Sequence, residues 1–371
     1  MKKRHWFVRI FSFFAIFSFL INCVCCSVSG ICYPVPNIQE DPSQISKEEM
    51  LVRFGFVTEE QQKAFEDICE KAGVALPDRF GTHELLQLVA STQERFVNRA
   101  DKQERWETEA LDWMQQNEDH LKEDFINLGL VNAALPSKTH YDAVCVLGAR
   151  RSEMEKRIKF VERLVKEGYY FDWVVLLTGA RPATVGIDGT LEEIEEIAQH
   201  FGINGSEVTE AYIFKYLYEM SSLSKGHFNL LVIDTPAKDG RRPTTQTTVE
   251  DFCKWCEGQP GKIEDALFIS SQPHVAYQKA IIKEIFRQNN CDLSFRVAGD
   301  SYVPNDNSVK TLAGALGSYI WVASPNVLRS LNFEIEAEND LELFNKAYGH
   351  APWLYNLRLC HAPRLYSLRL F

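Results

Sequence analysis

From residue 141 onward, short and continuous apolar runs alternate with longer segments in which apolar residues recur at helical spacing. Continuous apolar runs are typical of strands buried on both faces, and strands separated by helices favour right-handed crossovers within a parallel sheet. The pattern therefore predicts a doubly wound, Rossmann-like α/β domain with a mostly parallel sheet over residues 138–330. The predicted strands are Ala143–Leu147, Trp173–Leu177, Asn229–Ile233, Ala266–Ser270 and a weaker run at Leu293–Val297.

Three segments between these runs have the spacing of a capping box. In a capping box a Ser or Thr side chain accepts a hydrogen bond from the backbone three residues on, where a Glu or Gln side chain reaches back. The spacing predicts helix starts at Ser152–Glu155, Thr190–Glu193 and Thr247–Glu250. These starts fall where the strand pattern requires helices.

A small all-α region is predicted ahead of the α/β domain. Residues 31–45 carry three prolines among polar neighbours and are expected to form a linker. Thr58–Gln61 has capping-box spacing, Pro77 interrupts the pattern, and residues 83–128 are rich in Glu, Gln, Leu and Ala. We expect roughly three to five helices over residues 46–137, with a solvated charged face and no chemistry of their own.

The first thirty residues have the pattern of an export signal. Basic residues precede an apolar run over residues 10–21, and small residues follow it. Extended to residue 28, the run is just long enough to span a bilayer. Residues 1–30 are therefore either a cleaved signal peptide or a membrane anchor in contact with the bilayer through residues 10–28. In both cases we expect an exported protein, periplasmic or anchored at the inner membrane with its domain outside the cytoplasm.

The C-terminal segment, residues 331–371, contains a direct repeat of eleven residues. His350-Ala-Pro-Trp-Leu-Tyr-Asn-Leu-Arg-Leu-Cys360 is followed by His361-Ala-Pro-Arg-Leu-Tyr-Ser-Leu-Arg-Leu-Phe371. Two copies are too few for a solenoid. The simpler interpretation is a loosely attached tail produced by duplication, and the alternative is a peptide that touches a membrane or binds a partner.

The charge balance argues against nucleic acid as a partner. Asp and Glu number 51 against 40 Lys and Arg, so the formal net charge is -11. A phosphate backbone would meet a repulsive field over most of such a surface. With 45% apolar and 25% charged residues, the composition is that of a globular protein and not of a disordered chain.

Ten cysteines are present, and four of them lie in or beside the N-terminal segment. Cys145 falls within a predicted strand, where a small buried side chain is the expected role. Outside the N-terminal segment, Cys253 and Cys256 form a lone Cys-x-x-Cys pair, which is either a redox couple in an oxidising compartment or part of one buried helix face. The rest of the chain beyond that segment has no second such pair that would predict a zinc site.

Turns after the predicted strands bring small and basic residues to one edge of the sheet. Helix N-termini at that edge present free N–H groups and the positive end of the helix dipole. Gly148 and Gly179 allow a ligand to approach the backbone, and Arg150, Arg151 and Arg181 are candidates to pair with an anion. Neither glycine turn is a P-loop or a Gly-x-Gly-x-x-Gly motif.

Four motifs, in order, resemble the bacterial family called domain of unknown function 218, which includes the SanA, ElyC and YdcF proteins. The motifs are Tyr141-Asp-Ala-Val-Cys-Val-Leu-Gly148, Leu177-Thr-Gly179, Thr248-x-Glu250-Asp251 and Ile269-Ser-Ser-Gln-Pro-His274, and the resemblance covers about 160 residues. The resemblance rests on order and spacing more than on any single motif. It implies a Rossmann-type domain held at the inner membrane and linked to envelope integrity, and it identifies a site without a reaction.

Three residues of these motifs are candidate catalytic groups, each with an ordinary structural alternative. His274, expected in the first turn of a helix, is an acid, a base or a hydrogen-bond donor, or else a packed surface residue. Glu250 is a catalytic carboxylate or the third residue of a capping box with Thr247. Asp251 orients His274, binds a ligand hydroxyl, or merely favours the helix dipole.

Candidate ligand-binding residues lie in the same turns and on the helix after the first strand: Gly148, Arg150, Arg157, Thr178, Gly179, Thr248 and Ser271. Arg157 matches an arginine common in the family, and a solvated salt bridge is its structural alternative. The sequence shows no clustered metal-ligand spacing and no Ser-His-Asp arrangement with a nucleophile elbow. It names no cofactor.

Three hypotheses follow. The preferred one is an envelope-associated domain that binds a small anionic ligand, phosphorylated or nucleotide-like, with an adenosyl compound as one candidate. Glu250, Asp251 and His274 would be its acid-base groups. The alternative is a non-catalytic scaffold with a degenerate pocket. Ala180, Asp251 and Tyr277 favour it, because they replace a glycine, an asparagine and an arginine of the family pattern, although Lys279 is a candidate substitute for the arginine. The third is a thiol redox protein, which requires an exposed sulfur in the Cys-x-x-Cys pair.

Overall fold

The structure, a computed structural model, describes six stretches of the chain: residues 44–98, 108–238, 242–258, 263–303, 308–331 and 338–348. The expected export segment, nearly all of the expected linker and the direct repeat lie outside them. In the part of the chain that is described, no helix combines the length and the apolar character needed to cross a bilayer.

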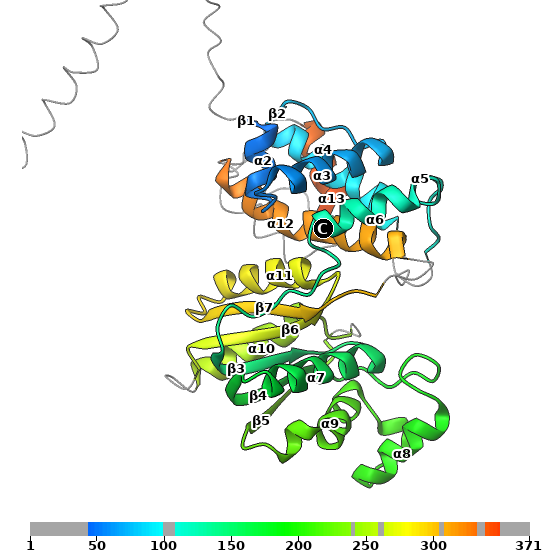
Figure 1. Cartoon of the computed structure of the whole chain (residues 1–371), viewed down its shortest axis with the longest axis vertical. Coiled ribbons are helices and arrows are strands. Elements are labelled where there is room, and N and C mark those ends of the chain that lie inside the picture. Colours follow the sequence, from blue (N-terminus) through cyan, green and yellow to red (C-terminus); the bar gives the residue numbers. More distant parts are fainter. Residues whose placement is uncertain are drawn as a thin grey trace, which may run out of the picture. The chain divides into compact units, whose positions relative to one another are not determined.

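Five parallel strands form the central sheet in the spatial order β5-β4-β3-β6-β7 (Figure 1). They are β3 (His140–Leu147), β4 (Tyr170–Gly179), β5 (Asn229–Thr235), β6 (Asp265–Ser271) and β7 (Ser294–Asp300). Every predicted strand is present, and the doubly wound, Rossmann-like fold is confirmed. The order reverses at the neighbouring strands β3 and β6, which is the position where such sheets bind ligands.

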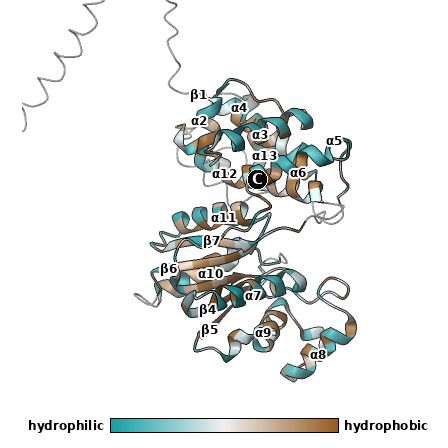
Figure 2. Cartoon of the chain, in the orientation of Figure 1, coloured by the Kyte–Doolittle hydropathy of each residue, from teal (hydrophilic) through white to brown (hydrophobic). Residues whose placement is uncertain are grey.

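Alternate residues of each central strand pack against helices on opposite faces. Val144 and Val146 of β3 belong to one core with α7 (Arg151–Lys166), α8 (Leu191–Phe201) and α9 (Glu210–Met220). Ala143 and Cys145 belong to the other core with α10 (Thr245–Glu257) and α11 (Val275–Gln288). Figure 2 shows the strands between these helices as largely hydrophobic. Burial of apolar surface on both faces holds the layers together.

Burial on both faces is complete in the central strands but not in β5. All residues of β3 from Ala143 to Leu147 are buried, whereas β5 is an edge strand whose Leu230 is 37% exposed. The prediction that every run is buried on both faces is therefore wrong for β5, and it is wrong in the same way for β7 at the other edge. An edge strand has a neighbour on one side only, so its side chains are less covered.

Two predicted capping boxes are confirmed and two are displaced. Thr58 begins α3 (Glu59–Ala72) and Thr190 begins α8, each with both hydrogen bonds of the box. By contrast, α7 begins at Arg151 with Arg150 as its N-cap, and α10 begins at Thr245 with Thr244 as its N-cap. Thr244 and Thr247 have the same capping-box spacing as Thr247 and Glu250. The two hydrogen bonds between Thr244 and Thr247 start α10 three residues earlier than predicted.

The helical region is completed by two C-terminal helices. Its N-terminal elements are β1 (Ile45–Ser46), α2 (Lys47–Arg53), α3, β2 (Arg79–Phe80), α4 (Thr82–Thr92), η2 (Gln93–Val97), α5 (Asp112–Gln116) and α6 (Glu118–Asn127). Their core also contains residues of α12 (Ser308–Ser330) and α13 (Glu338–Tyr348), such as Leu316 and Phe344. The expected boundary at residue 330 therefore differs from the boundary between the cores, because apolar spacing identifies a helix without identifying its partner.

Two short helices complete the α/β part. They are η4 (Gly205–Glu207) and η5 (Ser222–Lys225), which flank α9. They lie between β4 and β5, in a connection that also contains α8. This connection contributes several of the side chains at the carboxyl edge of the sheet.

Candidate functional site

The carboxyl ends of the strands bring the candidate residues to one edge of the sheet. Gly148 follows β3, Gly179 ends β4 and Ser271 ends β6, and the strands are all parallel. Thr248 lies in the first turns of α10, and His274 is the N-cap of α11. The predicted meeting of βα turns at one edge is therefore confirmed.

Arg157 occupies the point where the strand order reverses. Its Nε donates to Ser271 Oγ at 3.0 Å, and its Nη1 donates to the carbonyl oxygens of Leu147 at 2.7 Å and Gly148 at 2.9 Å. The residue is 5% exposed. Three residues that the sequence singled out, Gly148, Arg157 and Ser271, thus form one hydrogen-bonded group that joins β3 to β6 through α7.

The charge of Arg157 is weakly compensated. Burial lowers the pKa of its guanidinium to about 10, and the nearby carboxylates Glu153 and Glu210 act in the opposite direction. Within the described residues, Arg157 makes no ion pair, and its Nη2 has no acceptor. A buried cation that makes no direct ion pair is costly, so this position favours an anion.

Glu210 fills the space beside Gly148. A Cβ atom at Gly148 would lie 2.2 Å from Glu210 Oε1 and 2.8 Å from the carbonyl oxygen of Leu177. Thr178 Oγ1 donates to the same carboxylate at 3.4 Å. Burial raises the pKa of Glu210, and Arg181 opposes the shift. The glycine is therefore required by a close approach of the chain itself, where we had expected a ligand.

Pro243 fills the space beside Gly179 in the same way. A Cβ atom at Gly179 would lie 2.4 Å from Cβ and 2.7 Å from Cγ of Pro243. Pro243 directly precedes Thr244, the N-cap of α10. The start of α10 is thus packed against the end of β4, and this part of the crevice is closed by a side chain.

The basic residues after β3 and β4 are largely engaged within the chain. Arg181 binds Asp188 through two hydrogen bonds of 2.7 and 2.8 Å and binds Glu210 through a third of 3.1 Å. Arg151 lies 3.2 Å from Glu193. Arg150 is the exposed N-cap of α7. Arg181, a candidate to pair with an anion, is therefore already neutralised by two carboxylates.

Thr248, Glu250 and Asp251 follow one another along α10. The Thr248 hydroxyl is buried and donates to the carbonyl of Thr245 at 3.1 Å. Glu250 accepts from Gln246 Nε2 at 2.8 Å, and it lies in the second helical turn, not at the third position of a cap. The interpretation of Glu250 as a capping residue is therefore wrong.

Asp251 is held by a neighbour on its own helix. Its Oδ1 accepts from Lys254 Nζ at 2.9 Å. Burial opposes the shift of its pKa, but Lys254 and the Thr235 hydroxyl at the end of β5 together lower it. These contacts keep Asp251 ionised beside β5 and give no support to its expected role in orienting His274.

His274 lies one residue before the helix in which it was expected. Its backbone N–H donates to the Ser271 carbonyl at 2.8 Å, and its carbonyl accepts from Gln278. The ring is half-buried and has no capping role. The preceding Gln272 donates from Nε2 to the carbonyls of Gly129 and Asn132, so the turn before His274 is fixed to the segment that follows α6.

Comparison with known proteins does not assign the chain to a family. No family model matches the chain. No curated protein is significantly similar to it. The resemblance to the domain-of-unknown-function family therefore stays a prediction that rests on the four motifs quoted above.

Several residues at this edge were not anticipated from sequence. Glu210 and Pro243 are distant in sequence from the glycines that they contact, and no local pattern reports such contacts. The sequence around Asp188 offered a signal for one of these contacts, because this carboxylate lies in the glycine-rich turn Gly186-Ile-Asp-Gly189. In the structure Asp188 is fully buried. A carboxylate embedded in a glycine-rich turn indicates a fixed partner, here Arg181.

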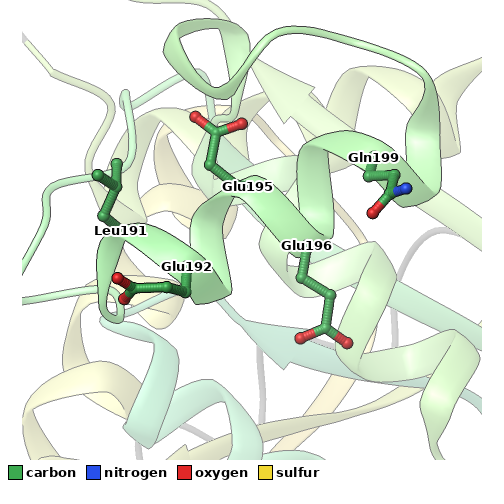
Figure 3. Close-up of a pocket in the computed structure, with 5 residues that line it drawn as sticks. All are labelled: Leu191, Glu192, Glu195, Glu196 and Gln199. Carbon is green, nitrogen blue, oxygen red and sulfur yellow. The ribbon is translucent and has the colours of Figure 1, made fainter.

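Two further features do not include the candidate residues. A surface hollow of about 530 Å³ is lined by five residues of α8 alone: Leu191, Glu192, Glu195, Glu196 and Gln199 (Figure 3). At the amino ends of β3 and β4, ligand atoms of His140, Asp142 and Asp172 lie within 4.8 Å of one another. The Asp142 carboxylate already accepts backbone hydrogen bonds from Glu264 and Asp265.

Proposed function

We propose that this protein is an envelope-associated domain that binds a phosphorylated or nucleotide-like molecule at the carboxyl ends of β3 and β6. The observation that carries the proposal is Arg157, which is buried where the strand order reverses and lacks an ion pair within the described residues. Parallel α/β sheets bind their ligands at this position. A phosphate oxygen at Nη2 would supply the missing counter-charge.

The surroundings of Arg157 restrict the class of ligand. Glu153 and Glu210 are near enough to affect its pKa, and their carboxylates would repel a ligand that was anionic throughout. Carboxylates at such an edge accept hydrogen bonds from sugar hydroxyls. A nucleotide combines one anionic group with ribose hydroxyls, and it suits this mixture of charges better than inorganic phosphate.

Glu250, Asp251 and His274 belong to the same proposal as groups at the edge of the site. Glu250 and Asp251 lie on α10, where Asp251 is beside β5, and His274 is the N-cap of α11. Their proposed role is to hydrogen-bond or to exchange protons with the ligand. The expected export segment supports an envelope location, and the net charge of -11 supports a small ligand over nucleic acid.

The proposal is tested by binding measurements with Arg157→Met. Isothermal titration with AMP, inorganic phosphate and adenosine separates the contributions of the phosphate and the nucleoside. We expect AMP to bind the unaltered chain best, and Arg157→Met to weaken AMP at least about tenfold, which corresponds to 1.4 kcal/mol. Lys159→Met is the matched control, because Lys159 lies on the same helix, exposed and paired with Glu155. If a folded Arg157→Met variant binds AMP as tightly as the unaltered chain, the proposed site at Arg157 is wrong.

The second candidate function is a non-catalytic scaffold. It is favoured by Glu210 and Pro243, which fill the space beside Gly148 and Gly179. A scaffold with a closed crevice would bind none of the three probes, and small molecules would not co-purify with it. Mass spectrometry of compounds released from the purified, unaltered chain therefore distinguishes the two candidates.

A further inference from the structure

The two edge strands of the sheet differ in how the chain covers them. Along the carboxyl half of β7, Gly299 exchanges backbone hydrogen bonds with Ala134 of the segment that follows α6. The amino half of β7 carries the exposed charge of Arg296. A covering segment and a charged side chain both hinder the addition of a strand from another molecule. The chain therefore protects this edge itself.

The opposite edge strand, β5, has no such cover among the described residues. It pairs with β4 alone, and neither isolated backbone bridge involves it (Figure 1). The outward N–H and C=O groups of an edge strand are available to a further strand. No residue from 228 to 233 is charged, although 25% of the chain is. In the part of the chain that is described, most of β5 therefore lacks both features that protect β7.

Apolar side chains on both faces of β5 are only partly covered. Leu231 and Ile233 pack at the margin of the core that contains α10. Val232 packs at the margin of the core that contains α9, and Leu230 on the same face is 37% exposed. Alternate residues of a strand point to opposite faces, so a strand added beside β5 would bury apolar surface on both.

We propose that β5 pairs in antiparallel orientation with β5 of a second copy of this chain, so that the two sheets become one continuous sheet. A twofold axis through Val232 places that residue opposite its own copy, and closed twofold pairs are the commonest protein oligomers. The same register sets Leu231 opposite Ile233 of the second copy. It sets Leu230 opposite Asp234, and each of these pairs occurs twice in the dimer.

The pattern of apolar and charged positions in β5 favours its own copy as the partner. In this register the central apolar residues meet apolar residues, and no like charges are opposed. The two Asp234 carboxylates lie four positions apart along the paired strands, about 13 Å at about 3.3 Å per residue. That separation exceeds the screening length of about 8 Å at physiological salt. Two copies that each carry a net charge of -11 can therefore meet along β5 with little local repulsion.

The proposed interface is separate from the proposed ligand site. In the sheet, β4 separates β5 from β3, and the ligand is proposed at the carboxyl ends of β3 and β6. One pair of strands makes a small interface, so we expect a reversible monomer–dimer equilibrium and not a permanent complex. The inference rests on β5 alone and stands whether or not the carboxyl edge of the sheet binds a nucleotide.

A pair of substitutions at Leu230 tests the pairing through charge. Leu230→Glu would oppose Asp234 of the second copy, whereas Leu230→Lys would attract it. Sedimentation equilibrium of the full chain in a density-matched nonionic detergent gives the dissociation constants. We expect the unaltered chain to dimerise, and Leu230→Lys to dimerise at least about tenfold more tightly than Leu230→Glu, because the altered pair occurs twice.

The matched controls are Leu191→Glu and Leu191→Lys, since Leu191 lies on α8 and is 55% exposed. They change the net charge equally and should leave dimerisation unchanged. An unaltered chain that stays monomeric at every concentration would overturn the proposal and leave the edge to a different partner. Equal dissociation constants for Leu230→Glu and Leu230→Lys would also overturn it, because position 230 would then not face Asp234.

Disulfide cross-linking of Val232→Cys tests the position of the twofold axis. Directly opposite residues of antiparallel strands have Cα atoms about 4.5–5.5 Å apart, a separation that a disulfide spans. After mild oxidation, the yield of covalent dimer on a non-reducing gel should exceed that of the unaltered chain at least about fivefold. Asp234→Cys is the control and should give no such gain, because the two copies of position 234 are too far apart. No gain from Val232→Cys, or a gain from Asp234→Cys alone, would overturn the assigned pairing.

Discussion

Arg157 Nε on α7 donates to Ser271 Oγ at the carboxyl end of β6, with 3.0 Å between the two atoms. Nη1 of the same side chain donates to the carbonyl oxygens of Leu147, the last residue of β3, and of Gly148. One buried side chain therefore connects a helix to both strands that meet where the order of the sheet reverses. The same side chain fixes the edge of the sheet and presents positive charge there.

Ser271→Ala should destabilise the protein by about 2 kcal/mol, because it leaves a buried N–H of Arg157 without an acceptor. Urea denaturation followed by circular dichroism measures the free energy of unfolding. Ser206→Ala is the control, since Ser206 is exposed in η4. Equal stability of the Ser271 and Ser206 variants would mean that the hydrogen bond contributes little to the fold.

Gly179→Ala should destabilise the chain by about 1–3 kcal/mol, because the new methyl group meets Pro243 at 2.4 Å. In a Pro243→Gly background the same change should cost less than about 1 kcal/mol, since all three of the nearest atoms belong to Pro243. Thermal or urea unfolding of the two single variants and the double variant gives the comparison. Additive costs would show that Pro243 does not pack on Gly179 in solution.

The fold could be predicted because its central strands are dense apolar runs. Every strand lies over its predicted run. The edge strands β5 and β7 depart only in burial, because the pattern does not reveal which strands are at the edges. The start of a helix was harder to predict where two hydroxyl side chains both have the spacing of an N-cap. Thr244 and Thr247 are both spaced for a cap, and the sequence alone does not decide between them.

The site could be predicted only as far as the strand ends define it. Gly148, Arg157 and Ser271 meet because their strands and helix place them together. Glu210 and Pro243 approach the edge from other parts of the chain, and their contacts depend on packing that no local pattern encodes. The helical spacing of α12 likewise did not reveal that it would pack with N-terminal helices.

Glu284 links α11 to α12 and should make the free energy of unfolding depend on pH. It is 1% exposed, accepts from Arg287, and accepts from Arg329 Nη2 at 2.5 Å. Burial opposes the shift, but the arginines lower the pKa of Glu284 overall. A lowered carboxylate pKa stabilises the fold above the unfolded value, which is about 4.3, and the contribution is lost as pH falls through the folded pKa.

Glu284→Gln should therefore cost about 2 kcal/mol at pH 7, less than a fully buried pair because both arginines are partly exposed. The difference from the unaltered chain should shrink below about pH 4. Urea unfolding across a pH series measures it, with exposed Glu123→Gln as control. A difference that stays constant with pH would assign the cost to altered packing and not to charge.

Asp188→Asn should be among the more destabilising changes in the loop that follows β4. Asp188 is fully buried. Its carboxylate accepts hydrogen bonds from Nη1 and Nη2 of Arg181 at 2.7 and 2.8 Å and from the backbone N–H of Thr184 at 3.0 Å. Burial opposes ionisation, yet Arg181 and these N–H donors lower the pKa of Asp188. Loss of the charge removes one of the two carboxylates that neutralise Arg181 and should cost about 3 kcal/mol.

A double-mutant cycle with Arg181→Met isolates the contribution of the pair. If Asp188 and Arg181 stabilise the loop chiefly through each other, removal of both should cost less than the sum of the single costs by at least about 1 kcal/mol. Urea unfolding of the four chains at pH 7 supplies the values. Glu210 remains available to Arg181 in the Asp188 variant, because its Oε2 lies 3.1 Å from Arg181 Nε. A coupling below about 0.3 kcal/mol would instead mean that Glu210 replaces Asp188 as the partner of Arg181.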